Sequence, residues 1–259
     1  MKLNNKVVLV TGAGSGMGRE LTLELVRRGA SVVAVDIHQS AVEETARMAG
    51  KDVKIFTLDL SDRAAIFDLP AKTGDIDCLI NNAGIIQPFL HVKDLPIEKA
   101  EKVLNVNFYG TLAMVQAFLP GLMKRPEAHI LNVSSMGAYA PVPGQSVYGA
   151  SKAAVKLLTE GLRSELLDTN VGVTIAFPGA VATNILENSG IDAPKISGDA
   201  SAFKQTSASA AAITMLDAIE QNKARVTIGK DAKMMDRLSR VNPVFAANLI
   251  YKQMKSLLN

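Results

Sequence analysis

Several residue types and patterns that other protein classes require are scarce in this sequence. Cys78 is the only cysteine, so no internal disulfide can form, and we expect a reducing, cytoplasmic location. The three histidines, His38, His91 and His129, are far apart and lack a carboxylate frame, so no metal site is predicted. No continuous run of about 18 apolar residues and no signal-peptide pattern is found, so neither a membrane span nor a secreted protein is expected.

Charge and composition also narrow the class. The 259 residues carry a formal net charge of only +3, and most basic residues are interleaved with acids, so nucleic acid is not a predicted partner. Hydrophobic residues make up 48% of the chain, enough to bury a large core. Strand-like and helix-like segments alternate from Lys6 to Ile228 without a linker, so we expect a single domain over residues 1–259.

The alternation predicts an α/β fold with a doubly wound parallel sheet and helices on both faces. The expected strands lie near 6–10, 31–36, 53–57, 77–80, 129–134, 171–176 and 225–228, and the expected helices near 17–28, 40–49, 62–68, 97–123, 146–168 and 208–221. In such a sheet, ligands bind at the carboxyl ends of the strands. We therefore expect the ligand crevice where these segments end.

A glycine-rich turn follows the first expected strand. Residues 11–18 read Thr-Gly-Ala-Gly-Ser-Gly-Met-Gly and lead directly into a helix. Glycines let backbone N–H groups approach a ligand, and a helix N-terminus favours a pyrophosphate. The spacing is T-G-x-x-x-G-x-G rather than G-x-G-x-x-G, which leaves a purely structural turn as the alternative.

An acidic residue, Asp36, ends the second expected strand. A carboxylate at this place accepts hydrogen bonds from both hydroxyls of an adenosine ribose and repels a 2′-phosphate, which favours NAD over NADP. Ser15, where a basic residue would hold a phosphate, points the same way. The alternative is that Asp36 merely caps the helix near Ser40.

A phenol, an ammonium and a hydroxyl recur in the second half of the chain. Tyr148 and Lys152 are four residues apart, so on a helix they share one face, and Ser135 precedes Tyr148 at a strand end. A nearby positive charge favours phenolate, so we expect Lys152 to draw the pKa of Tyr148 down toward neutral pH. By themselves, Tyr and Lys at this spacing are also common on solvated helix faces.

Taken together, these motifs resemble those of the short-chain dehydrogenase/reductase family of about 250 residues. The resemblance spans about residues 5–185 and adds Asn81-Asn-Ala-Gly84, Asn107 and Pro178-Gly179 with Thr183. It implies a Rossmann-like fold with catalytic Asn107, Ser135, Tyr148 and Lys152; Ser135 is preferred to Ser134, and Asn107 to Asn105, by spacing. The cofactor-binding residues it implies, with those read above, are Gly12, Ser15, Gly16, Met17, Gly18, Asp36, Asp59, Leu60, Asn82, Ala83, Gly84, Tyr148, Lys152, Pro178, Val181 and Thr183.

The resemblance also implies a mechanism. Tyr148 takes the alcohol proton while hydride leaves the same carbon, and Ser135 holds the substrate oxygen. Lys152 bonds the nicotinamide ribose, and Asn107 positions a water that links Lys152 to solvent. Asp59 meets the adenine, Asn82 to Gly84 pass beside the adenosine ribose, and Val181 and Thr183 hold the carboxamide. Pairing of the long helices would give a homodimer or homotetramer.

Two regions are expected to set the substrate. Residues 184–205 hold Gly, Pro, Ser and Ala and suggest a lid, and residues 230–259 form an apolar extension with helical spacing. That extension packs on the body or a sister subunit, walls an apolar substrate pocket, or contacts a membrane surface. The small apolar segments Pro141-Val-Pro143 and Ile85-Ile86 favour an apolar substrate.

Three functions remain open at this stage. The first is an NAD-dependent enzyme that interconverts a secondary alcohol and a ketone. The second is an NADP-dependent 3-oxoacyl thioester reductase, against which Asp36 argues. The third is a non-enzymatic NAD-binding regulator, which we would expect to have lost Ser135, Tyr148 or Lys152.

Overall fold

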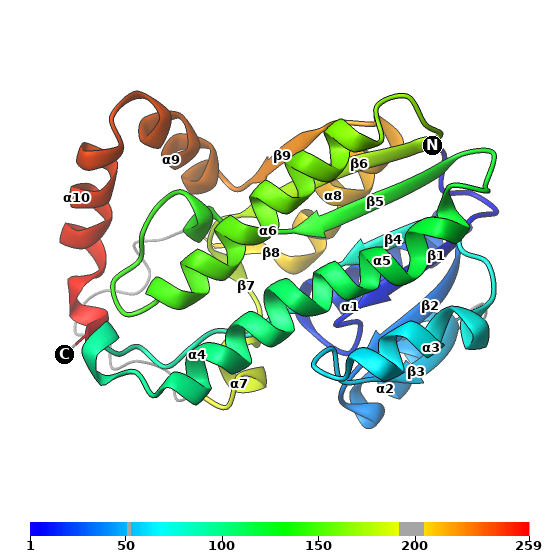
Figure 1. Cartoon of the computed structure of the whole chain (residues 1–259), viewed down its shortest axis with the longest axis horizontal. Helices are drawn as coiled ribbons and strands as arrows, with labels where there is room; N and C mark the ends of the chain where they lie inside the picture. Colours follow the sequence, from blue (N-terminus) through cyan, green and yellow to red (C-terminus); the bar gives the residue numbers. More distant parts are fainter. Residues whose placement is uncertain (51–52, 192–204, 259) are drawn as a thin grey trace.

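A parallel seven-stranded sheet forms the centre of the molecule (Figure 1). The computed structural model describes residues 1–50, 53–191 and 205–258. The strand order is β3-β2-β1-β4-β5-β6-β9. The strands are β1 (Val7–Thr11), β2 (Ser31–Asp36), β3 (Val53–Thr57), β4 (Cys78–Asn81), β5 (Ala128–Val133), β6 (Val171–Pro178) and β9 (Arg225–Ile228). The order reverses direction between β1 and β4, and this is the point where such sheets bind ligands.

Helices cover both faces of the sheet (Figure 1). One face carries α1 (Gly16–Arg27), α2 (Gln39–Ala49) and α8 (Ala208–Glu220); the other carries α3 (Arg63–Thr73), α5 (Thr111–Leu122) and α6 (Ser146–Glu165). A hydrophobic core lies on each face of the sheet, and alternate residues of a strand point into one or the other. Val8 and Val10 face α1 and α8, whereas Leu9 faces α3 and α5. The predicted doubly wound α/β fold and its strands are confirmed.

The predicted helix over residues 97–123 is wrong in its middle. The chain forms α4 (Ile97–Leu104), a π-helical segment η2 (Asn105–Gly110) and then α5. The wider turn lets the carbonyl of Asn105 accept a hydrogen bond from Arg63 at 3.0 Å and places the Asn107 side chain, fully buried, toward the loop after β4. Periodicity alone does not separate one extra residue in a helix from a regular helix.

Further elements lie outside the main alternation. A two-stranded parallel pair joins β7 (Val181–Ala182) to β8 (Thr206–Ser207), and a short helix α7 (Ile185–Asn188) follows β7. Within the described residues, 3-10 turns are found at η1 (Val92–Asp94), η3 (Met136–Ala138) and η5 (Lys255–Leu258). Of the predicted lid over 184–205, residues 192–204 lie outside the described residues, so the structure gives only its two ends.

The expected helical extension is present as α9 (Lys230–Val241) and α10 (Pro243–Met254) at one end of the molecule (Figure 1). Its inner side chains Met235, Ala246 and Ile250 form a small core with Ala140 of the body. This confirms the packing role for the inner side of the extension. Among the described residues, no helix combines the length and apolar character needed to cross a bilayer.

Candidate functional site

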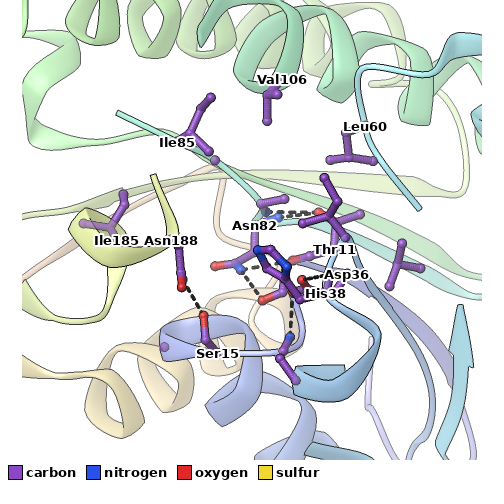
Figure 2. A pocket seen from close by; sticks show the side chains of 18 of the residues that line it. Thr11, Ser15, Asp36, His38, Leu60, Asn82, Ile85, Val106, Ile185 and Asn188 are labelled. Atoms are coloured by element: carbon purple, nitrogen blue, oxygen red, sulfur yellow. Dashed lines mark hydrogen bonds between the residues drawn. The ribbon is translucent and has the colours of Figure 1, made fainter. Parts of the chain in front are cut away.

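A cavity of about 330 Å³ opens at the carboxyl ends of β1, β2 and β4, at the point where the strand order reverses (Figure 2). Its wall contains the predicted residues Gly12, Ser15, Gly16, Met17, Asp36, Asp59, Leu60, Asn82, Ala83, Gly84 and Thr183. The cavity is also lined by Val35, Ile37, His38, Ala41, Leu58, Ser61, Ile85, Lys102, Val106, Ile185 and Asn188, of which the sequence had pointed only to Ile85, as part of an apolar substrate pocket, and to Ile185 and Asn188, as part of the lid. The volume is in the range of small-molecule sites.

The glycine turn forms one wall because side chains would not fit there. Gly12 and Gly16 have φ values of +68° and +49°, which other residues rarely adopt. A Cβ on Gly12 would lie 2.9 Å from the Ala83 Cα, and a Cβ on Gly18 would lie 1.9 Å from the Gly12 carbonyl oxygen. Gly18 therefore packs behind the turn and does not line the cavity.

Helix α1 begins at this wall without a side-chain cap. The N-cap residue Ser15 makes no capping bond, and its hydroxyl instead accepts a 2.7 Å hydrogen bond from Asn188 of α7. Figure 2 shows the two side chains directed toward one another. The first N–H groups of the helix, at Gly16 and Met17, thus border the cavity with the positive end of the helix dipole, which suits an anionic group.

Asp36 stands at the end of β2, beside the turn. One carboxylate oxygen accepts from the Gly14 N–H at 2.8 Å, and the other accepts from the His38 N–H at 2.9 Å. The alternative role of helix cap is not observed, because the N-cap residue of α2 is His38 and no side chain caps that helix. Each oxygen retains a lone pair that can accept from a bound hydroxyl.

Thr11, the last residue of β1, fixes the loop that follows β4 through three hydrogen bonds. The Thr11 hydroxyl accepts from the N–H groups of Asn82 and Ala83 at 3.0 and 3.1 Å, and the Asn82 amide donates to the Thr11 carbonyl at 3.0 Å. The Asn82 Oδ1 atom is buried and has no hydrogen-bond partner among the described residues. A buried acceptor without a donor is unusual in a folded protein and fits a bound polar ligand.

Asp59 and Leu60 form a further part of the wall after β3. The carboxylate of the exposed Asp59 accepts from the Ser61 N–H at 2.8 Å, and Leu60 is buried. In Figure 2 the apolar side chains of Leu60, Ile85 and Val106 lie on one side of the cavity. A wall with an anion-binding helix end, a carboxylate and an apolar surface matches the phosphate, ribose and base of a dinucleotide.

Ser135 and Tyr148 meet beyond the carboxyl end of β5. The Ser135 hydroxyl accepts from the Gly137 N–H at 3.0 Å and lies beside the Tyr148 ring, since a Cβ on Gly137 would be 3.5 Å from both the Ser135 Oγ and the Tyr148 Cε1. Tyr148 lies in the first turn of α6, and Gly137 packs against its ring, because a Cβ there would be 3.5 Å from the Tyr148 Cε1. The predicted phenol–hydroxyl pair is therefore brought together.

Lys152 and Asn107 converge on Gly84. A Cβ on Gly84 would lie 3.1 Å from the Lys152 Nζ and 3.2 Å from the Asn107 Oδ1. The buried Lys152 ammonium donates to the Val133 carbonyl at 3.0 Å. The Asn107 amide accepts from the Ile85 N–H at 2.8 Å and donates to the Ile85 carbonyl at 2.9 Å, so it fixes the loop next to Lys152.

The prediction that Lys152 draws down the pKa of Tyr148 is wrong for this structure. Burial raises the pKa of Tyr148, and the nearby Ser135 hydroxyl offsets this only in part. Burial also lowers the pKa of Lys152 to about 8. The ammonium is bonded to a backbone carbonyl, while the phenol is stabilised in its neutral, protonated form.

Gln87 is a site residue that the sequence did not reveal. Its fully buried side-chain oxygen accepts from the N–H groups of Val147 and Tyr148 at 2.8 and 2.9 Å, and its nitrogen donates to the Gly144 carbonyl at 3.0 Å. Gln145 donates in turn to the Gln87 carbonyl at 2.6 Å. Gln87 thus caps α6 from a distant loop and fixes the backbone that carries Tyr148.

Pro178, Val181 and Thr183 follow β6 along the same edge of the sheet. Pro178 pairs with Ile228 in the sheet and, like Val181, does not line the cavity. Thr183 does, and it covers the turn, since a Cβ on Gly16 would lie 3.2 Å from the Thr183 Cβ. The Ala180 N–H donates to Asp231 of α9 at 2.6 Å, which ties this turn to the extension.

No cluster of three His, Cys, Asp or Glu side chains suited to a metal ion is found within residues 1–50, 53–191 and 205–258. Fold and site together define a nucleotide-binding α/β protein with a tyrosine–serine pair next to its cavity. Residues 6–193 match the family model for short chain dehydrogenases, and the chain belongs to this family of oxidoreductases.

Relatives and solved structures agree with that assignment. The chain is 34% identical over 250 residues to SadH of Mycobacterium tuberculosis (strain CDC 1551 / Oshkosh), a protein named as an oxidoreductase, with 91% and 90% of the two chains covered. It resembles a short chain dehydrogenase from Burkholderia cenocepacia J2315 in complex with NADP, with a TM-score of 0.83, 27% identity and 96% and 99% of the chains covered.

A third likeness is to the 3-ketoacyl-(acyl-carrier-protein) reductase from Brucella melitensis complexed with NADH, with a TM-score of 0.78, 27% identity and coverage of 87% and 96%. The solved relatives thus hold NADP in one case and NADH in the other. A nicotinamide cofactor is therefore supported. These relatives do not decide between NAD(H) and NADP(H), so that choice must be argued from the residues of this chain.

Proposed function

We propose that this protein is an NAD(H)-dependent dehydrogenase that interconverts a secondary alcohol and a ketone on an apolar molecule. The observation that carries the proposal is that Ser135 and Tyr148 lie together beyond the end of β5, with Lys152 one helical turn after Tyr148 and next to Gly84 of the cavity wall. These groups suit proton transfer at a carbon–oxygen bond.

The choice of NAD rests on Asp36. Its carboxylate stands at the strand end where the adenosine ribose of a bound dinucleotide would lie, held by Gly14 and His38. A 2′-phosphate placed there would meet a negative charge at short range, which disfavours NADP. Among the described residues, Lys102 of α4 is the one Lys or Arg side chain that lines the cavity.

The proposed roles follow from each residue's position. When bound, the nicotinamide supplies or takes up the hydride. Tyr148 exchanges the proton with the substrate oxygen, and Ser135 holds that oxygen by a hydrogen bond. Because burial keeps the Tyr148 phenol protonated at neutral pH, it is ready to act as the acid in the reduction of a ketone.

Lys152 and Asn107 serve the cofactor side of the site. Lys152 lies next to Gly84, which lines the cavity, so its ammonium is placed to bond the nicotinamide ribose. Asn107 holds the loop between them through Ile85, and the water relay expected of it stays a prediction. In the wider site, the turn from Gly12 to Met17 would receive the pyrophosphate, Asp59 the adenine and Thr183 the carboxamide, whereas the cofactor contacts expected of Gly18, Pro178 and Val181 stay predictions.

The 3-oxoacyl thioester reductase remains a second candidate because the solved reductase from Brucella melitensis is 27% identical to this chain and was captured with NADH. Asp36 therefore does not separate the two reactions. The substrate does: a thioester reductase acts on a ketone next to an acyl thioester, whereas the first proposal requires turnover of simple secondary alcohols.

The first experiment follows NADH formation by its near-ultraviolet absorbance with a panel of secondary alcohols, graded from small and polar to large and apolar. The same assay with NADP, and with 3-oxoacyl thioesters in the reverse direction, separates the candidates. The Tyr148→Phe variant is the control, because turnover must depend on the phenol. Tight NAD binding without turnover of any of these substrates would contradict the proposal and favour the NAD-binding regulator.

A further inference from the structure

The C-terminal pair of helices, α9 and α10, has an outer surface that the proposed reaction does not use. Six consecutive residues at the corner between the helices, from Arg240 to Phe245, are exposed. The large apolar side chains that are more than half exposed in this region are Met234 (51%), Val241 (85%), Val244 (69%), Phe245 (55%) and Tyr251 (55%). So many apolar side chains on one small element are unusual for a surface that only meets water.

Basic residues are concentrated along the two helices that meet at this corner. Residues 230–259 hold six basic side chains and two acidic ones, a formal charge of +4, whereas the whole chain has only +3, so the other 229 residues sum to −1. All six basic side chains are exposed: Lys230, Lys233, Arg237, Arg240, Lys252 and Lys255. The positive charge of the protein is therefore concentrated in its last two helices.

Both acidic side chains of the extension point inward. Asp231 accepts from the Ala180 N–H at 2.6 Å, and Asp236 pairs with Arg225 of β9 and, at 3.3 Å, with Arg240. Among the described residues, Arg240 is the one basic side chain of the extension that forms an ion pair. The outer surface thus presents apolar and basic groups, because the carboxylates of Asp231 and Asp236 are bonded to the body of the protein.

We propose that the corner Val241–Phe245 and the basic residues beside it dock the protein on an anionic lipid bilayer. Charge complementarity selects an anionic partner, and the apolar side chains between the basic ones suit a partner with an apolar layer beneath its charges. A second copy of the chain fits less well, because a two-fold interface would set one basic surface against another.

The helices that carry the proposed docking surface also contact the segment that leads to Tyr148. The inner side of the same two helices packs on Met136, Tyr139 and Val142, in the segment between Ser135 and Tyr148. At the end of the extension, Leu258 approaches Gly144, where a Cβ would lie 3.0 Å from the Leu258 Cδ2. The extension therefore links the proposed docking surface to the segment that leads to Tyr148. The inference stands on the surface alone and does not depend on the reaction.

The test is co-sedimentation of the full chain with vesicles of phosphatidylcholine alone, or with an equal part of phosphatidylglycerol. We expect binding to the anionic vesicles that weakens as salt rises. The double variant Arg237→Gln/Lys252→Gln should lower the partition coefficient roughly 25-fold, since each basic residue contributes about fivefold. The double variant Val244→Ser/Phe245→Ser should lower it about tenfold.

Matched controls remove equivalent side chains elsewhere. Lys72→Gln/Lys124→Gln removes two exposed charges, and Phe67→Ser removes an exposed aromatic ring on α3. Neither should change partitioning. The proposal is overturned if the chain ignores both vesicles, if it binds both equally, or if Val244→Ser/Phe245→Ser binds as well as the unchanged chain. It is also overturned if that variant instead converts a dimer into a monomer in sedimentation velocity.

Discussion

The replacement Gln87→Met tests whether Tyr148, the proposed proton donor, is held from a distant loop. Methionine has a similar length and no strong hydrogen-bonding group, so the change removes three bonds and little volume. The N–H groups of Val147 and Tyr148 lose their acceptor, at 2.8 and 2.9 Å, and the Gly144 carbonyl loses its donor. Each unsatisfied buried group costs about 1–3 kcal/mol, and the loss of a helix cap about 0.5–2 kcal/mol.

Because the helix-cap cost and the cost of the two orphaned N–H groups describe the same bonds, we take about 3 kcal/mol as the expected loss. In a chain of this size that lowers the melting temperature by about 6–12 °C. The rate constant kcat should fall up to about a hundredfold, because a displaced Tyr148 no longer matches the substrate oxygen. The affinity for NAD should change little, since Gln87 does not line the cavity.

The matched variant is Gln87→Glu. A carboxylate keeps both acceptor bonds, is favoured at a helix N-terminus, and loses only the bond to Gly144, so we expect a loss of about 1 kcal/mol. Thermal unfolding followed by far-ultraviolet circular dichroism measures both variants. A Gln87→Met protein that melts within about 1 °C of the unchanged chain would refute the reasoning.

Three further predictions concern single residues. Tyr148→Phe should lower turnover about 10²–10⁴-fold while NAD binding, measured by fluorescence titration, stays unchanged; equal turnover would remove the tyrosine from the mechanism. Asp36→Ala should weaken NAD binding about 10- to 100-fold and narrow the preference over NADP; an unchanged preference would contradict the assignment. His129 has a pKa lowered by burial to about 3 from 6.5, so the unfolded chain binds a proton that the folded chain refuses. Stability should therefore fall as the pH drops below 6.5, by up to about 1.4 kcal/mol per pH unit. The variant His129→Gln should flatten that slope in urea unfolding at pH values between these limits.

The sequence predicted most of the fold because the signals for it are local. The glycine turn and Asp36 are set by residues close together in the chain, and the strands are read from short apolar runs. Asp36 and Gly14 meet because parallel strands bring their carboxyl ends to one edge. The pairing of Ser135 with Tyr148 followed from spacing that the family resemblance made meaningful.

The rest depends on contacts between residues far apart in the sequence. Gln87 reaches Val147 across 60 positions, and Asn188 reaches Ser15 across 173. Nothing in the local sequence around Gln87 or Asn188 marks them as partners of a helix or of a turn. The protonated state of Tyr148 was also missed, because it depends on burial, which a spacing of four residues does not reveal.

The π-helical segment over residues 105–110 has a consequence for protein engineering. Such a turn holds one residue more than a regular helix of equal length, so deleting one residue would restore regular hydrogen bonding to the helix. The same deletion would turn the side chains within residues 105–110 to new positions, because fewer residues would then make up the same turn. Asn107 would then leave Ile85. Designers who regularise this helix to raise thermal stability should expect to lose activity, and length variation in this segment between homologues should be rare.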